Sequence, residues 1–242
     1  MCRPRPATAE TLIAAAPPGY HTRMSGVELC NIRDVWYHNL EKFPRKTAAI
    51  CEGRALTYGE CDRLTDRLHR ALVKRFGVSA GTTVAIAAPN DLEYFLVFWA
   101  LMKCGAVAVP VNTRLGPPEL RHVIDSCRAD VLFVHRSCWR RMTDAAAGRP
   151  FRFVIGIAFD EEGVVPFEAL LEDEGGPVDA TDIRGDDLAI VMYTSGTTGV
   201  PKGATMRHAD LLFNNRLAIY AHSLRHEDVN LLVVPMFHAT AL

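Results

Sequence analysis

The sequence predicts an α/β fold in which parallel-rich sheets are flanked by helices. Short runs rich in β-branched residues, such as 82–88, 106–111 and 130–135, alternate with segments whose apolar residues recur at helical spacing. This alternation indicates parallel strands joined by right-handed crossovers. The chain has 242 residues, of which 49% are hydrophobic, and this is enough for a sizeable core.

Helix caps and chain breakers define the order of the elements. Thr57 and Glu60 form a capping-box pattern, and Gly77 is expected to end the helix that they start. Asn90 is expected to cap the next helix, which is apolar nearly all round and stops at Gly105. The expected helices are 27–43, 57–76, 90–104, 117–127, 137–147, 167–171 and 209–222. The expected strands are 46–51, 54–57, 82–88, 106–111, 130–135, 152–158, 188–193 and 229–234, and residues 204–206 are expected to be extended.

Charge and hydropathy argue against two classes of partner. The net charge is −1 and the pI is about 6.7, whereas nucleic-acid-binding domains usually have a pI above about 9, so no nucleic acid is expected. The most apolar stretch, 94–111, carries Lys103 and Gly105 near its middle. It therefore predicts a buried helix followed by a strand, and no transmembrane segment is expected.

The cysteine pattern indicates a reducing compartment. Seven cysteines are an odd number, and no two of them form a Cys-x-x-Cys pair. We therefore expect thiols in a cytoplasmic protein and no disulfide framework. No group of cysteines or histidines has the spacing of metal ligands, so no metal site built from protein side chains is expected.

The stretch 188–204 carries the clearest chemical signal in the chain. Its first six residues predict a buried strand, which leads into a loop rich in hydroxyls and glycines and ending with one lysine. The residues concerned are Thr194, Ser195, Gly196, Thr197, Thr198, Gly199, Lys202 and Gly203. Backbone N–H groups in such a loop can form an anion-binding concavity, and hydroxyls and a lysine add hydrogen bonds to phosphate oxygens. On composition alone, a polar hairpin loop without a ligand is an equal alternative.

The loop does not have the Walker A spacing. Six residues separate Gly196 from Gly203, and Ala204 follows where Lys-Ser or Lys-Thr would be needed. A kinase or GTPase function therefore has no support here.

Residues 193–203, Tyr-Thr-Ser-Gly-Thr-Thr-Gly-Val-Pro-Lys-Gly, resemble the phosphate-binding loop of the adenylate-forming enzymes. That superfamily includes acyl-CoA synthetases, aryl-CoA ligases, luciferases and the adenylation domains of peptide synthetases. Further stretches are similar to the same superfamily in order and spacing, namely 56–60, 88–91, 103–112 and 120–124. These stretches contain caps, turns and core residues, so we interpret them as scaffold.

A second motif, Pro235-Met236-Phe237-His238, lies just past the strand expected at 229–234. A lone histidine beside apolar residues is more often a core residue, but the carboxyl ends of strands are where open α/β sheets place ligand contacts. The motif also resembles the Phe-His of the superfamily, which lies near the acyl pocket. Peptide-synthetase domains usually have Phe-Asp there, so Phe237 and His238 favour a CoA ligase over an amino-acid activator. Ala241 departs from the family, which often has glycine at that place.

The resemblance implies a reaction in which a small-molecule carboxylic acid is joined to AMP from ATP and then passed to a thiol, commonly that of CoA. It implies that Lys202 and His238 are catalytic and that Phe237 and His238 bind the acid. It also implies that Mg²⁺ bridges phosphate oxygens without a protein ligand from this chain. The residues it assigns to ATP are Thr194, Ser195, Gly196, Thr197, Thr198, Gly199 and Lys202.

The resemblance covers less than half of a typical family member, so we expect an incomplete N-terminal domain that is not competent alone. The expected parts are a loose extension at 1–26, an α/β scaffold subdomain at 27–187 with an acidic connector at 159–187, and the start of a nucleotide-binding subdomain at 188–242. Alternatives are a non-catalytic phosphate-binding remnant or an adenylation domain of another subfamily. The particular acid, the thiol acceptor and the oligomeric state stay open.

Overall fold

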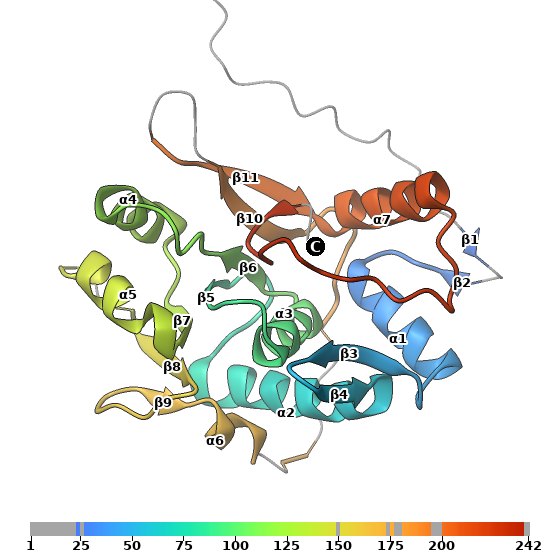
Figure 1. The fold of residues 1–242 in the computed structure, drawn as a ribbon, viewed down its shortest axis with the longest axis horizontal. Coiled ribbons are helices and arrows are strands. Elements are labelled where there is room, and N and C mark those ends of the chain that lie inside the picture. The colour runs from blue at the N-terminus through green and yellow to red at the C-terminus, as the bar shows by residue number, and fades with distance from the viewer. Residues whose placement is uncertain are drawn as a thin grey trace, which may run out of the picture.

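A mostly parallel sheet runs through the middle of the protein (Figure 1). The computed structural model describes residues 23–24, 27–148, 151–172, 175–176, 181–194 and 200–239. Within these residues the sheet has seven strands in the order β11-β10-β6-β5-β7-β8-β9, and β11 alone is antiparallel to its neighbour. The strands are β5 Thr83–Ala87, β6 Val107–Pro110, β7 Val131–His135, β8 Phe153–Ile157, β9 Val165–Pro166, β10 Leu188–Thr194 and β11 Lys202–Arg207. The predicted α/β class is confirmed.

Helices cover both faces of this sheet (Figure 1). Side chains alternate across a strand, so Ile86 and Phe133 join a core with α2 and α3, whereas Leu132 and Val134 join a second core with α4 and α5. The helices are α1 Ile32–Lys42, α2 Tyr58–Phe76, α3 Leu92–Cys104, α4 Pro117–Cys127, α5 Trp139–Ala146, α6 Glu168–Leu171 and α7 His208–His222, with a short 3₁₀ turn, η1, at Arg136–Cys138. Two small antiparallel pairs complete the described part: β1 Arg23–Met24 with β2 Val27–Glu28, and β3 Thr47–Cys51 with β4 Arg54–Thr57.

The predicted caps determine where the long helices begin and end. The Thr57 side chain accepts a hydrogen bond from the N–H of Glu60, and the Glu60 carboxylate accepts from the N–H of Thr57, which completes the capping box of α2. Gly77 and Gly105 end α2 and α3 in the left-handed region, with φ of 68° and 69°. Both positions tolerate this conformation because glycine has no Cβ.

Two helix starts differ from the prediction. The first helix begins at Ile32 rather than at residue 27, because Asn31 forms a capping box with Asp34 and the preceding residues 27–28 are in β2. In α3 the cap is Asp91, whose carboxylate accepts from the N–H of Tyr94. Asn90 does not cap α3; its side chain is hydrogen-bonded instead to the backbone near residue 235.

The prediction of a strand at 229–234 is wrong. These residues have no regular structure, and Val229, Leu231 and Val233 are each more than three-quarters exposed. An apolar run becomes a buried strand only where a neighbouring strand and a covering layer exist. Among the described residues no strand pairs with this segment, so most of its apolar side chains face solvent.

The sheet continues through residue 188, where a boundary between subdomains is expected. β10 pairs in parallel with β6 through Ile190 and Ala108, so residues on either side of the expected boundary share one sheet. The division into subdomains stays a prediction. The loose extension expected at 1–26 lies outside the described residues except for 23–24, which pair with 27–28.

One buried cation joins three helices. The Lys103 side chain of α3 is 1% exposed, and its Nζ lies 2.6 Å from a carboxylate oxygen of Asp62 and 2.6 Å from one of Asp66, both on α2. The Nε1 of Trp36 on α1 donates to the same Asp62 oxygen at 2.9 Å. The interaction therefore links α1, α2 and α3 on one face of the sheet.

The described cysteines are free thiols. Six described cysteines form no disulfide, and three of them, Cys61, Cys104 and Cys138, are buried. Among the described residues, no helix is long and apolar enough to cross a membrane.

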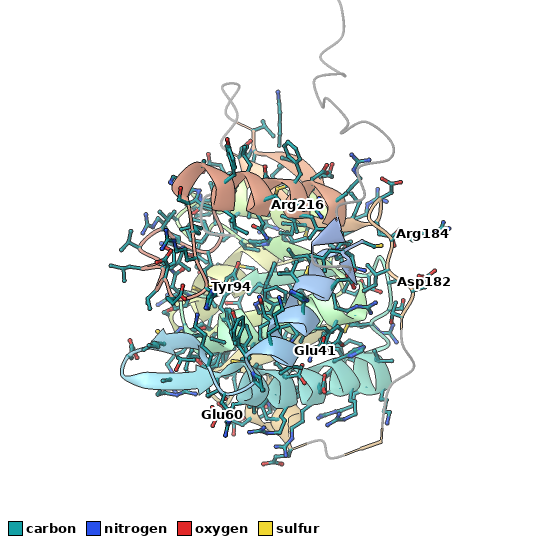
Figure 2. All side chains as sticks on the ribbon, turned by 90° about the vertical axis from the view of Figure 1, so that its right-hand side faces the viewer. Glu41, Glu60, Tyr94, Asp182, Arg184 and Arg216 are labelled. Carbon is teal, nitrogen blue, oxygen red and sulfur yellow. The ribbon has the colours of Figure 1, made fainter. Side chains whose placement is uncertain are left out.

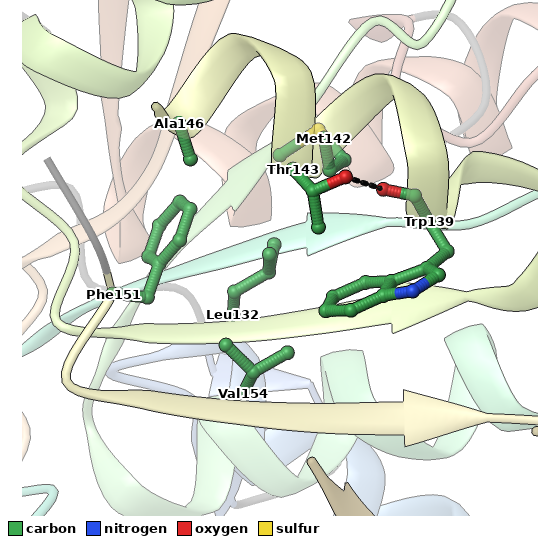
Figure 3. A pocket seen from close by; sticks show the side chains of 7 residues that line it. All are labelled: Leu132, Trp139, Met142, Thr143, Ala146, Phe151 and Val154. Carbon is green, nitrogen blue, oxygen red and sulfur yellow. Dashed lines mark hydrogen bonds between the residues drawn. The ribbon is translucent and has the colours of Figure 1, made fainter. Parts of the chain in front are cut away.

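A cavity of about 220 Å³ lies between α5 and the strands β7 and β8 (Figure 3). Apart from Thr143 its lining is apolar, namely Leu132, Trp139, Met142, Ala146, Phe151 and Val154.

Candidate functional site

The hydroxyl- and glycine-rich loop closes the hairpin between β10 and β11. The antiparallel register pairs Thr194 with Lys202, so residues 195–201 connect the two strands. Thr194 and Lys202 are both exposed at the base of this connection, and their side chains are accessible to a ligand. An exposed ammonium beside a hydroxyl suits a polyphosphate, because hydrogen bonds to charged groups are the stronger ones. The remaining predicted loop residues, Ser195, Gly196, Thr197, Thr198 and Gly199, lie outside the described residues.

Helix α4 contacts both ends of this loop. The Ser126 and Tyr193 hydroxyls are hydrogen-bonded at 2.9 Å, and the Nε2 of His122 lies 3.1 Å from the carbonyl oxygen of Pro201. A carbonyl only accepts, so His122 donates here and carries its proton on Nε2. Burial raises the pKa of the Tyr193 phenol, which therefore stays protonated at neutral pH. Sequence analysis did not identify these contacts, because they join residues far apart in the chain.

Removing the imidazole donor should loosen the second end of the loop. We expect His122→Phe to increase the rate of amide hydrogen exchange at Lys202 and Gly203 by about fivefold, the value of one ordinary hydrogen bond. His122→Gln restores an N–H donor and should keep the exchange rate close to that of the unmodified chain. Exchange measured by NMR tests this. Equal rates in all three proteins would show that the contact does not stabilise the loop end.

The second predicted motif is held at the end of the chain that the structure describes. Phe237 is buried, with 8% exposure, and His238 is exposed. Their ring centroids lie 4.8 Å apart. The backbone N–H of His238 donates to the carbonyl of Pro235 at 2.9 Å in a tight turn. The His238 ring is therefore accessible, while Phe237 fixes the segment to the core.

The loop and the second motif lie at the same edge of the sheet. Thr194 is at the carboxyl end of β10, and Asn90, which contacts the second motif, follows the carboxyl end of β5. β10, β6 and β5 run parallel, so these ends meet at one edge, where open α/β sheets bind ligands. In Figure 1 the segment that follows α7 returns toward β5 and α3. The predicted residues Thr194, Lys202, Phe237 and His238 thus belong to one edge of the sheet.

A buried histidine at the start of α7 is a further polar group near the hairpin. His208 is fully buried, and neither ring nitrogen has a hydrogen-bond partner in the described part of the chain. Burial lowers its pKa to about 4, with the nearby Arg33 guanidinium acting in the same direction and Asp187 and Asp34 opposing it. The ring is therefore neutral at pH 7. Its location in the core indicates a structural role.

The neutral His208 should make the chain less stable in mild acid. Below pH 6.5 the unfolded chain takes up a proton on this ring, whereas the folded chain does so only near pH 4, so stability falls as the pH decreases through this window. We expect a loss on the order of 2 kcal/mol from this group. Asp91, whose pKa burial raises to about 6, titrates in the same window with the opposite effect.

A comparison of variants distinguishes the titration of His208 from that of Asp91. The difference in unfolding free energy between His208→Gln and the unmodified chain should shrink from pH 7 to pH 4, as measured by denaturant unfolding. The matched control is His222→Gln, which replaces an exposed histidine on the same helix. A pH-independent difference for His208→Gln would contradict the assignment.

These features define an open α/β protein with a hydroxyl- and glycine-rich hairpin loop and an exposed histidine at the carboxyl edge of its sheet. A family model described as "AMP-binding enzyme" matches residues 36–242. The chain therefore belongs to the AMP-binding enzyme family.

Several curated relatives are CoA ligases. The chain is 36% identical over 199 residues to a feruloyl-CoA synthase from Amycolatopsis sp., a match that covers 82% of this chain and 38% of the relative. It is 35% identical over 205 residues to an indoleacetate–CoA ligase from Aromatoleum aromaticum, with 82% and 39% covered. The chain thus spans about two fifths of the length of these relatives.

Solved structures with the same fold carry similar descriptions. A putative long-chain-fatty-acid CoA ligase from Rhodopseudomonas palustris superimposes with a TM-score of 0.81 at 27% identity, covering 87% of this chain and 53% of that one. An anthranilate CoA ligase in complex with anthranoyl-AMP superimposes with a TM-score of 0.74 at 28% identity, covering 81% and 38%. The mostly parallel sheet with helices on both faces is thus the fold of N-terminal regions of these enzymes.

Proposed function

We propose that this chain supplies the phosphate-binding loop and part of the acid-binding wall of an AMP-forming carboxylic acid–CoA ligase. The observation that supports this most is the hairpin of β10 and β11, which pairs Thr194 with Lys202, both exposed, at the base of the Ser-Gly-Thr-Thr-Gly loop. In the proposed reaction a carboxylate oxygen of the acid attacks the α-phosphorus of ATP and pyrophosphate leaves. The acyl group then passes to the sulfur of CoA, and AMP is released.

The proposed roles follow from charge and position. Residues 194–199 and Lys202 hold the β- and γ-phosphates, and the Lys202 charge stabilises the negative charge that develops on the leaving pyrophosphate. When bound together with ATP, Mg²⁺ would supply positive charge that offsets the negative charge of the phosphates. His238 is exposed and Phe237 is buried beside it; in the proposed site the His238 ring contacts the acid and Phe237 supports the apolar wall.

The substrate class is a small-molecule carboxylic acid. The names of relatives and structural neighbours refer to feruloyl-CoA, indoleacetate, long-chain fatty acids, crotonobetaine or carnitine, and anthranilate, and the feature that these acids share is a carboxylate. The complete reaction belongs to a longer protein, because this chain spans only about two fifths of the first relatives.

Calorimetric titration of the 242-residue chain with ATP and Mg²⁺ tests the proposed binding function. We expect a dissociation constant on the order of tens of micromolar, which corresponds to about −6 kcal/mol. AMP, which lacks the β- and γ-phosphates, should bind much more weakly. Circular dichroism establishes that the titrated chain is folded. ATP and AMP binding equally well to the folded chain would contradict a site built for the two outer phosphates.

A further inference from the structure

The side chain of Asn90 contacts the backbone just before His238. Its Nδ2 donates to the carbonyl of Val234 at 2.9 Å, and its Oδ1 accepts from the N–H of Met236 at 2.7 Å. A primary amide carries a donor and an acceptor, so it bonds residues i and i+2 of an extended backbone as a neighbouring strand would. Residues 229–233 before this point are irregular and largely exposed, and Met236 and Phe237 after it are buried, so the Asn90 contact lies where the chain returns to the core.

Tyr94 is hydrogen-bonded to the other backbone polar group of Met236, its carbonyl. Its hydroxyl donates to the carbonyl of Met236 at 3.3 Å, and its ring is fully buried; Tyr94 is labelled in Figure 2. Burial raises the pKa of this phenol, with the Asp91 carboxylate adding to the effect, so the hydroxyl stays protonated and remains a donor. Both backbone polar groups of Met236 are therefore hydrogen-bonded to one short stretch, 90–94.

The two side chains are positioned by the central strand β5 and the buried helix α3. Asn90 follows the central strand β5, and the Asp91 carboxylate caps α3 through the N–H of Tyr94. Asn90 is available for the Met236 contact because Asp91, its neighbour, caps the helix. The carbonyl of Asn90 also lies within hydrogen-bond reach of the Cys51 thiol on β3. These contacts therefore set the position of the segment that contains His238 relative to β5 and α3.

The fixed register determines which side chain faces outward. With Met236 held on both sides, Met236 and Phe237 are buried, at 6% and 8% exposure, and His238 is exposed. A shift of one residue in one direction would place His238 at the buried position of Phe237, and a shift in the other direction would place Phe237 at the exposed position of His238. We propose that Asn90 and Tyr94 are positioning residues that orient the His238 ring toward the carboxylic acid substrate. This rests on the function proposed above and assigns to these two residues a role in the geometry of its acid site.

Asn90→Asp is the sharpest test, because it keeps the size of the side chain and replaces the donor to Val234 by a carboxylate oxygen, which repels the Val234 carbonyl and displaces the segment. We expect amide exchange at Met236 to rise on the order of tenfold and the His238 ring Cε1–H resonance to shift in NMR spectra of the 242-residue chain. Tyr94→Phe, which removes one hydroxyl and keeps the ring packing, should give a smaller increase in exchange. Asn214→Asp, at an exposed position on α7, is the matched control and should change neither quantity.

Benzoate serves as the probe of the acid site. Added at millimolar concentration, it should shift the His238 ring resonance in the unmodified chain and in Asn214→Asp, and shift it less in Asn90→Asp. Unchanged exchange and an unchanged His238 resonance in Asn90→Asp and Tyr94→Phe would overturn the positioning role. Faster exchange with an unaltered His238 ring would also overturn it, because the contact would then be structural only. If benzoate has no effect on any protein while the other changes occur, the positioning of His238 stands and the proposed acid-binding function fails.

Discussion

Replacing Lys202 by alanine should weaken the binding of ATP and Mg²⁺ to the chain by about ten- to a hundredfold. Hydrogen bonds between charged groups contribute about 1.5–3 kcal/mol, and the exposed ammonium lies at the base of the loop opposite Thr194. Calorimetric titration of Lys202→Ala against the unmodified chain measures the effect. Because the side chain is exposed, the difference should shrink as the salt concentration rises.

Two control variants make this result specific. Lys74→Ala removes an exposed lysine from α2, and its ATP affinity should not change. Lys202→Arg keeps the positive charge and should retain most of the affinity at low salt. Equal affinities of Lys202→Ala and Lys74→Ala would remove Lys202 from the phosphate site.

The largest loss of stability is expected from Lys103→Met. The substitution leaves the Asp62 carboxylate, whose side chain is 19% exposed, without the cation 2.6 Å away. Breaking one side of a buried ion pair typically costs about 3–5 kcal/mol. Asp66 is 45% exposed and regains water, so we expect about 2–4 kcal/mol in the free energy of unfolding, measured with urea.

A double variant distinguishes the uncompensated Asp62 charge from a loss of packing as the cause of the lower stability. In the double variant Lys103→Met with Asp62→Asn, the uncompensated charge is gone, and the amide oxygen can still accept from Trp36. We expect the double variant to recover a substantial part of the lost stability. If Lys103→Met unfolds at the same urea concentration as Lys74→Met, the buried interaction contributes nothing.

The sequence predicted the elements whose limits are determined by neighbouring residues. The capping box of Thr57 with Glu60 and the end of α3 at Gly105 are local interactions, so they were visible in the pattern. At Asn90-Asp91, two adjacent residues were both suitable caps, and the choice depended on a distant partner, Met236. For residues 229–234 the apolar pattern was clear, but a strand also requires a neighbour that the described chain does not offer.

The same distinction holds for the candidate site. For the loop from Thr194 to Lys202, the residue types indicated phosphate binding and an unliganded hairpin equally, and the resemblance to the adenylate-forming enzymes favoured phosphate binding. The supporting residues His122, Asn90 and Tyr94 were not predicted, because each contacts a segment at least 79 positions away. Such contacts depend on the strand order, which a single sequence does not specify.

Transplanting the loop tests the central claim, that residues 193–203 hold the phosphates of ATP during adenylation. These eleven residues would replace the corresponding segment of the feruloyl-CoA synthase from Amycolatopsis sp., and ferulate-dependent exchange of pyrophosphate into ATP would be measured. We expect the transplanted loop to support exchange, and the same loop with Lys202→Ala to be slower by about 10²–10³, the usual cost of losing one charge-stabilising group. Equal exchange rates of the two transplants, or no exchange by a folded enzyme that carries the unaltered loop, would contradict the claim.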